Sequence, residues 1–134
     1  MKPCVVYFSR TGNTKRFAQA IGDAVKAPVF DLSSTQPSAL AEFDVLILGT
    51  PVEGASPAKE TAAYIESLPK VVNKKVFLFC TYRVFGNERT VKKMEKDLKD
   101  KGYVPIGKVS KKGMNPDKQA DFSKEIAEVQ KVLT

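Results

Sequence analysis

The stretch CVVYFSRTGNTKRF, residues 4–17, brings a strand, a polar loop and the start of a helix into direct succession. Residues 4–9 form a largely apolar run rich in β-branched and aromatic side chains, which is typical of a strand buried on both faces. Apolar residues then recur at helical spacing, which predicts an amphipathic helix. Its inward face is expected to carry Phe17, Ile21, Ala24 and Val25. Between the two elements lie one glycine and four short polar residues: Ser9, Thr11, Gly12, Asn13 and Thr14.

The same alternation of strand and helix continues along the chain. Further apolar runs predict strands at 28–32, 44–50, 75–81 and 103–110. The segment 33–43 is expected to be loop with one helical turn. Helices are predicted over 56–68, over 88–101 and from residue 115 onward.

Proline indicates where several of these elements begin. Ser56-Pro57 is typical of an N-cap followed by the first residue of a helix, and Asn115-Pro116 is expected to open the last helix. Pro28 begins the second predicted strand and Pro105 interrupts the fifth. Because proline cannot donate a ladder hydrogen bond, these two strands are expected at the edges of the sheet.

Solid apolar central strands need helices on both faces of a parallel sheet. We therefore predict an α/β fold: a three-layer, doubly wound sandwich around a five-stranded parallel sheet of order 2-1-3-4-5. One domain is expected to span residues 1–134. In this order the chain reverses direction between the first and third strands, and a ligand crevice opens there at the carboxyl ends of the strands. Three loops reach that crevice, at 9–14, 50–57 and 81–87.

Composition excludes several classes of function. The chain has no histidine, which rules out histidine-based triads and histidine metal sites. Cys4 and Cys80 are too far apart in sequence for a metal-binding motif, and both are expected to be reduced thiols, Cys80 as a core residue. No apolar run approaches the length of a membrane span, and the N-terminus lacks a signal-like segment. A cytoplasmic protein outside the membrane is therefore expected.

The loop 9–14 has the chemistry of a phosphate site. Backbone N–H groups at the start of a helix lack intrahelical partners, and the helix dipole favours an anion there. Gly12 allows the backbone to approach a ligand closely. The hydroxyls of Ser9, Thr11 and Thr14 and the amide of Asn13 can each donate a hydrogen bond. Helix capping alone explains any single one of these residues, but four donors around a glycine at the crevice favour a phosphomonoester.

The sequence Ser-Arg-Thr-Gly-Asn-Thr of this loop resembles the phosphate loop of the flavodoxin family, [Thr/Ser]-x-Thr-Gly-x-Thr, without mismatch. The resemblance covers the whole chain, in the short-chain element order without an insertion in the fifth strand. It implies bound FMN, one-electron transfer by the flavin, and an isoalloxazine ring between the loops 50–57 and 81–87. It also implies that the FMN phosphate lies on Ser9, Thr11, Asn13 and Thr14.

The resemblance assigns roles to the second loop as well. Thr50 is expected to contact the ribityl chain, and a backbone carbonyl near Gly54 is expected to accept a hydrogen bond from N5 of the reduced flavin. A simple Gly-Pro turn is the alternative for this glycine. Many flavodoxins carry an aromatic residue in this loop, whereas this chain has Val52 and Glu53.

Ring stacking is therefore expected from the third loop. There Tyr82 is expected to cover the flavin, and Phe85 is expected to pack within the protein. The full set of predicted cofactor-binding residues comes from all three loops. Its members are Ser9, Arg10, Thr11, Gly12, Asn13, Thr14, Thr50, Pro51, Val52, Glu53, Gly54, Thr81, Tyr82 and Gly86.

The net charge of +7 is concentrated in residues 70–118, which contain 14 Lys and Arg against 5 Asp and Glu. Four pairs at i,i+4 spacing are expected to form a solvated ion-pair surface: Glu88–Lys92, Lys93–Asp97, Glu95–Lys99 and Lys96–Asp100. The remaining basic excess is Lys70, Lys74, Lys75, Arg83, Arg89, Lys108, Lys111 and Lys112.

This excess predicts an acidic redox partner, such as a ferredoxin-like protein or a reductase, that docks by electrostatic steering. Positive charge near the flavin also predicts a less negative potential for the second reduction step than in acidic flavodoxins. Nucleic acid is not expected as a partner, because the sequence has no recognised nucleic-acid motif.

Together these features predict a monomeric FMN-binding electron carrier rather than a stand-alone enzyme. Two alternatives stay open. One is an FMN-dependent reductase of a small molecule such as a quinone. The other is a binding module that keeps the fold but holds flavin weakly or not at all.

Overall fold

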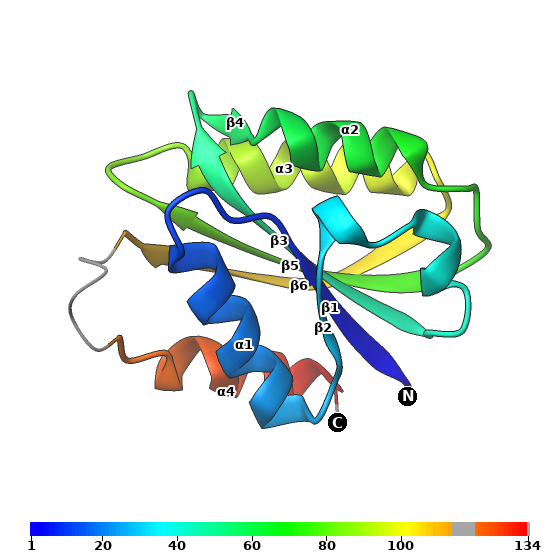
Figure 1. Ribbon diagram of the computed structural model, residues 1–134, viewed down its shortest axis with the longest axis horizontal. Coiled ribbons are helices and arrows are strands. Elements are labelled where there is room, and N and C mark those ends of the chain that lie inside the picture. Colours follow the sequence, from blue (N-terminus) through cyan, green and yellow to red (C-terminus); the bar gives the residue numbers. More distant parts are fainter. Residues whose placement is uncertain (114–119, 134) are drawn as a thin grey trace.

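The computed structural model describes residues 1–113 and 120–133. Figure 1 shows a twisted sheet between two layers of helices, with α2 and α3 on one face and α1 and α4 on the other. Along the chain the elements are β1 (Pro3–Tyr7), α1 (Asn13–Val25), β2 (Val29–Asp31), the 3-10 turns η1 (Leu32–Ser34) and η2 (Pro37–Leu40), β3 (Val45–Glu53), β4 (Ser56–Pro57), α2 (Lys59–Ser67), β5 (Lys74–Tyr82), α3 (Asn87–Lys99), β6 (Tyr103–Lys112) and α4 (Ser123–Leu133).

The sheet confirms the predicted topology. Its five parallel strands follow the order β2-β1-β3-β5-β6, so the strands predicted at the edges, 28–32 and 103–110, lie there. At Pro105 the register of β6 against β5 shifts, because Val76 pairs with Pro105 but Phe77 pairs with Gly107. The extra residue is accommodated as a bulge, which is tolerated at an edge.

Alternating side chains of the strands form two apolar cores. On β3, Leu46 and Leu48 pack in the cluster that α2 and α3 cover, whereas Val45 and Ile47 pack in the cluster that α1 and α4 cover. Helical spacing in the sequence predicts an inward face on α2 and another on α3, and burial confirms both: Thr61, Ile65 and Leu68 on α2, and Val91, Met94 and Leu98 on α3. None of the helices in the described part of the chain combines the length and the apolarity that crossing a bilayer requires.

The predicted loop at 50–57 is wrong in form. β3 continues to Glu53 and folds back as a hairpin, with Val52 paired to Pro57 and Glu53 paired to Ser56. Ser56-Pro57 is therefore strand rather than a helix start, and α2 begins two residues later. A two-residue hairpin with positive φ at both central positions explains the difference, because such a turn suits the strand twist. The predicted helix start at Asn115-Pro116 lies outside the described residues.

Most of the predicted ion pairs on α3 are also wrong. Lys93 and Asp97 pair at 3.0 Å, whereas Glu95 lies 3.5 Å from Lys108 of β6 instead of pairing with Lys99. The structure forms neither Glu88–Lys92 nor Lys96–Asp100 within its described residues. Exposed pairs of this kind gain little against the side-chain entropy they cost, so spacing alone does not form them.

Candidate functional site

Three loops meet at the carboxyl ends of β1, β3 and β5, as expected. The hydroxyls of Thr14 and Thr81 lie 2.8 Å apart and connect the start of α1 to the end of β5. A Cβ atom added to Gly86 would lie 2.8 Å from Cα of Ala55 and 3.1 Å from Cγ1 of Val52. The third loop therefore contacts both the first loop and the hairpin tip.

In the first loop, Ser9 organises the backbone and keeps a donor available. Its hydroxyl oxygen accepts hydrogen bonds from the backbone N–H groups of Gly12, at 3.1 Å, and Lys15, at 3.2 Å. These bonds use both acceptor positions of the hydroxyl, and its O–H has no acceptor within the described part of the chain. Ser9 thus does the helix-capping that sequence alone also allowed, without losing its donor.

Gly12 and Thr11 form the open side of this loop. Gly12 has φ +99°, a left-handed conformation that favours glycine, and a Cβ atom there would meet no atom of the described residues within 4 Å. Thr11 is exposed beside it. Asn13 is the first residue of α1.

Thr14 also makes a structural bond that the sequence did not indicate. Its side chain is 1% exposed, and its hydroxyl is bonded to that of Thr81. This bond ties the start of the helix to β5, and the backbone N–H of Thr14 adds a donor at the helix end.

In the second loop, Thr50 is fully buried and holds the base of the hairpin. Its hydroxyl donates to the backbone carbonyl of Pro51 at 3.0 Å and accepts from the N–H of Ala58 and the hydroxyl of Thr61. All of its hydrogen-bonding positions are therefore used inside the protein. Sequence reasoning missed this cluster, because Thr61 appeared only as a member of the inward face of α2.

The tip of the hairpin consists of two residues in the left-handed region. Gly54 has φ +59° and Ala55 has φ +60°. The conformation is ordinary for glycine but costs a residue with a side chain about 1 kcal/mol. A Cβ atom at Gly54 would meet nothing within 4 Å among the described residues, so the backbone here faces open space.

Arg10 turns towards the hairpin and away from the loop in which it lies. Its guanidinium donates two hydrogen bonds to Glu53, both at 2.8 Å, and two to Glu60 of α2, both at 2.9 Å. The guanidinium carbon also lies 4.9 Å from the ring centroid of Phe8. Hydrogen bonds from Arg10 hold the pKa of Glu60 below its ordinary value, and the two carboxylates raise the pKa of Arg10. No sequence pattern indicated Glu60.

The third loop offers one half-buried aromatic residue and an exposed tip. Tyr82 is half-buried at the end of β5, and Gly86 has φ +97° at the start of α3. The prediction that Phe85 packs within the protein is wrong, because Phe85 is 74% exposed and its neighbour Val84 is 75% exposed.

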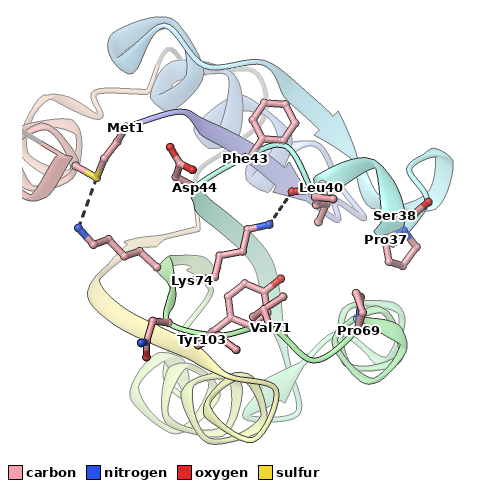
Figure 2. Close-up of a pocket in the computed structure, with 14 residues that line it drawn as sticks. Met1, Pro37, Ser38, Leu40, Phe43, Asp44, Pro69, Val71, Lys74 and Tyr103 are labelled. Carbon is pink, nitrogen blue, oxygen red and sulfur yellow. Dashed lines mark hydrogen bonds between the residues drawn. The ribbon is translucent and has the colours of Figure 1, made fainter.

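The basic residues of 70–112 that the structure describes do not form one surface. Lys74 and Lys75 begin β5, at the opposite end of the sheet, where they line a hollow of about 560 Å³. In Figure 2, Lys74 reaches the backbone carbonyl of Leu40, to which it donates a hydrogen bond at 2.7 Å, and Met1 lies across the hollow. Arg83 and Arg89 instead lie beside the three loops, as does Lys112, which pairs with Tyr82 in the sheet.

A family model described as a flavodoxin domain matches residues 4–131. The chain belongs to the flavodoxin family. A flavodoxin of Megasphaera elsdenii is 32% identical over 111 residues, which cover 77% of this chain and 80% of the relative. The family function, that of an FMN-binding electron carrier, is therefore the function of this chain.

Solved flavodoxin structures agree with the fold described above. The structure of oxidised flavodoxin 1 of Bacillus cereus has a TM-score of 0.83 at 18% identity, covering 99% of this chain and 97% of that one. The solution structure of two-electron reduced Megasphaera elsdenii flavodoxin has a TM-score of 0.79 at 29% identity, covering 97% and 96%.

The residues of loop 9–14 fit the phosphate of FMN. The space in front of Gly12 is open, and the surrounding donors are uncharged hydroxyl and backbone N–H groups at a helix start. The open face of Gly54 lies on the hairpin that the third loop touches at Gly86. Arg10, the one cationic residue of the loop, is directed to two carboxylates, so the cradle itself is neutral.

Proposed function

We propose that this flavodoxin holds the FMN phosphate in loop 9–14 and the isoalloxazine ring between the hairpin tip and Tyr82, and passes single electrons between protein partners. The bound FMN supplies the redox chemistry, and the protein supplies position and electrostatics. The open left-handed backbone at Gly12, next to Thr11 and bonded through its N–H to Ser9, is the observation that carries this proposal.

Each loop has a separate task in this arrangement. Ser9 and Thr11 donate to phosphate oxygens, and the backbone N–H groups of Asn13 and Thr14 add donors at the start of α1. Because the Thr50 hydroxyl is saturated, Thr50 and Pro51 contact the ribityl chain through their backbone. Gly54 presents a carbonyl to flavin N5, and Val52 lies beneath the ring beside Gly86.

We also propose that the exposed tip of the third loop is where a redox partner docks. Val84 and Phe85 present apolar surface next to the proposed ring site, and Arg83, Arg89 and Lys112 surround it with positive charge. An acidic protein, such as a ferredoxin-like protein or a reductase, has the complementary charge. A reducing compartment such as the cytoplasm suits the two cysteines, which are both free and buried.

The proposed phosphate site is tested by substituting Thr11, which is exposed and whose hydroxyl bonds to none of the described residues. Titration of apoprotein with FMN and with riboflavin separates the phosphate from the ring. Thr11→Val is expected to weaken FMN binding roughly tenfold, since one donor to a charged group is lost, and to leave riboflavin binding unchanged. Thr11→Ser keeps the hydroxyl and is the matched control. Wild-type protein that takes up no FMN, or equal FMN affinity in both variants, would contradict the assignment.

A further inference from the structure

The Arg10 side chain bonds to two carboxylates that lie in different elements. It belongs to the loop after β1, whereas Glu53 ends the long arm of the β3–β4 hairpin and Glu60 lies in the first turn of α2. Four of the five N–H donors of a guanidinium are engaged: Nε and one Nη2 hydrogen with Glu53, and one hydrogen each on Nη1 and Nη2 with Glu60.

A tether at Glu53 acts directly on the turn of the hairpin. It directly precedes Gly54 and pairs in the ladder with Ser56, so it fixes one side of the two-residue turn. The turn itself is held in a left-handed conformation at Gly54 and Ala55. A paired carboxylate on Glu53 therefore limits how far this turn can move relative to loop 9–14.

We propose that Arg10 is a positioning residue that couples the phosphate loop to the ring-facing hairpin, an inference that rests on the proposed FMN site. A ligand that orders loop 9–14 orders the hairpin through Arg10 and Glu53, and the reverse holds equally. Arg10 acts through these carboxylates and not as a phosphate ligand, because its donors already point at Glu53 and Glu60.

The same three side chains also set the charge beside the ring. Two carboxylates and one guanidinium leave one negative charge next to the hairpin. Removal of the Arg10 charge leaves two, and neutralisation of Glu53 leaves none. Because reduction adds negative charge to the flavin, the first change makes its reduction potentials more negative and the second makes them less negative.

The test compares Arg10→Gln, Glu53→Gln and Arg10→Lys with wild type, using FMN and riboflavin as ligands and both reduction potentials as readouts. The first two variants both break the tether, so each is expected to bind riboflavin and FMN roughly five- to tenfold more weakly. Their potentials are expected to shift in opposite directions. Arg10→Lys keeps the charge but cannot span both carboxylates, so its potentials stay near wild type while its affinity falls.

Three results would overturn the coupling. Weaker FMN binding with unchanged riboflavin binding in Arg10→Gln would make Arg10 a phosphate ligand. Undiminished affinity for both ligands in Glu53→Gln would remove the tether, and a lower apoprotein Tm with unchanged riboflavin affinity would leave a structural role only. Glu60→Gln keeps the Arg10–Glu53 bonds and is therefore the control that should bind both ligands like wild type. If Arg10→Gln or Glu53→Gln does not fold, the other of the two carries the test.

The failure of the proposed function has a different signature. If wild-type protein takes up neither FMN nor riboflavin, the flavin site and the coupling fail together. If wild type binds both and the Arg10 and Glu53 variants match it, the coupling alone is wrong.

Discussion

The hydroxyl oxygens of Thr14 and Thr81 lie 2.8 Å apart, and both side chains are buried, at 1% and 5% exposure. Thr14 lies in the first turn of α1, at the end of the phosphate loop, and Thr81 is the next-to-last residue of β5, at the start of the third loop. One buried hydrogen bond thus fixes the distance between the two loops proposed to hold opposite ends of the cofactor. Either hydroxyl left without its partner would be a buried, unsatisfied polar group.

A double-mutant cycle tests this relationship. Thr14→Val and Thr81→Val are each expected to lower the free energy of unfolding by about 1–3 kcal/mol, because each leaves one buried hydroxyl unpaired. The double variant is expected to cost less than the sum of the two, by at least about 0.5 kcal/mol, since valine packs against valine. Urea unfolding of the apoproteins gives the free energy of unfolding of wild type, both single variants and the double variant. Strictly additive losses would show that the two hydroxyls do not interact.

The strands and helices were predictable because burial imposes a period on the sequence. Continuous apolar runs at 44–50 and 75–81 mark central strands, and Pro105 marks an edge, whatever the tertiary contacts. The position of loop 9–14 at the start of a helix was predictable for the same local reason, because an apolar run precedes it and a helical pattern follows it.

Long-range side-chain partners were not predictable in this way. The bond from Thr14 to Thr81 spans 67 positions and that from Arg10 to Glu60 spans 50, and neither leaves a periodic signal. The hairpin was missed because its turn needs positive φ at both Gly54 and Ala55, and alanine rarely adopts that conformation. The following Ser56-Pro57 instead resembles the start of a helix. Phe85 was wrongly predicted to be buried, because its aromatic character favours burial but a single loop residue has no periodic pattern that shows which way it faces.

Two glycines in left-handed conformations should respond differently to alanine. Gly12→Ala meets open space, so it is expected to cost about 1 kcal/mol of stability for φ alone while its methyl group enters the phosphate site. Gly86→Ala brings its Cβ to 2.8 Å from Cα of Ala55, which adds about 1–3 kcal/mol of overpacking. Urea unfolding and FMN titration of both variants measure the difference.

In that comparison Gly12→Ala is expected to lose FMN affinity with little loss of stability, and Gly86→Ala is expected to lose both. The reverse order of stabilities would mean that the hairpin and third loop do not touch as described.

The contribution of Glu60 to stability should depend on pH in a defined direction. Hydrogen bonds from Arg10 lower the pKa of Glu60 from its ordinary value of 4.5. A depressed carboxyl pKa stabilises the fold above the unfolded-state pKa, and that stabilisation is lost as the pH falls through the folded-state pKa. Wild type is therefore expected to exceed Glu60→Gln in unfolding free energy from pH 7 to about pH 5, with the gap closing below pH 4.5. Urea titrations at each pH measure it, and a gap that widens in acid would contradict the pairing.

The proposed ring contact of Tyr82 is separable from its packing. Tyr82→Phe keeps an aromatic face and is expected to bind riboflavin like wild type. Tyr82→Leu loses that face and is expected to bind it roughly tenfold more weakly, because aromatic pairs contribute about 1 kcal/mol beyond buried area. Fluorescence titration with riboflavin measures both. Equal affinity in the leucine variant would place the ring elsewhere.

The split of the basic residues between two ends of the molecule allows a charge prediction with an internal control. Arg83 and Arg89 flank the proposed ring site, whereas Lys70 and Lys75 lie at the amino ends of the strands. Arg83→Gln/Arg89→Gln is expected to make the second reduction potential more negative, because nearby positive charge stabilises the negative charge that reduction adds. Lys70→Gln/Lys75→Gln removes the same net charge from the far end and is expected to change the potential little, since screening at 0.1 M salt acts over about 10 Å.

Spectroelectrochemical titration of the three proteins gives the potentials. Raising the salt to 1 M, where the screening length falls to about 3 Å, should shrink the difference between the two pairs of substitutions. Equal shifts from both pairs of substitutions would mean that net charge and not placement sets the potential. A second reduction potential of wild type as negative as that of acidic flavodoxins would refute the role of the basic residues altogether.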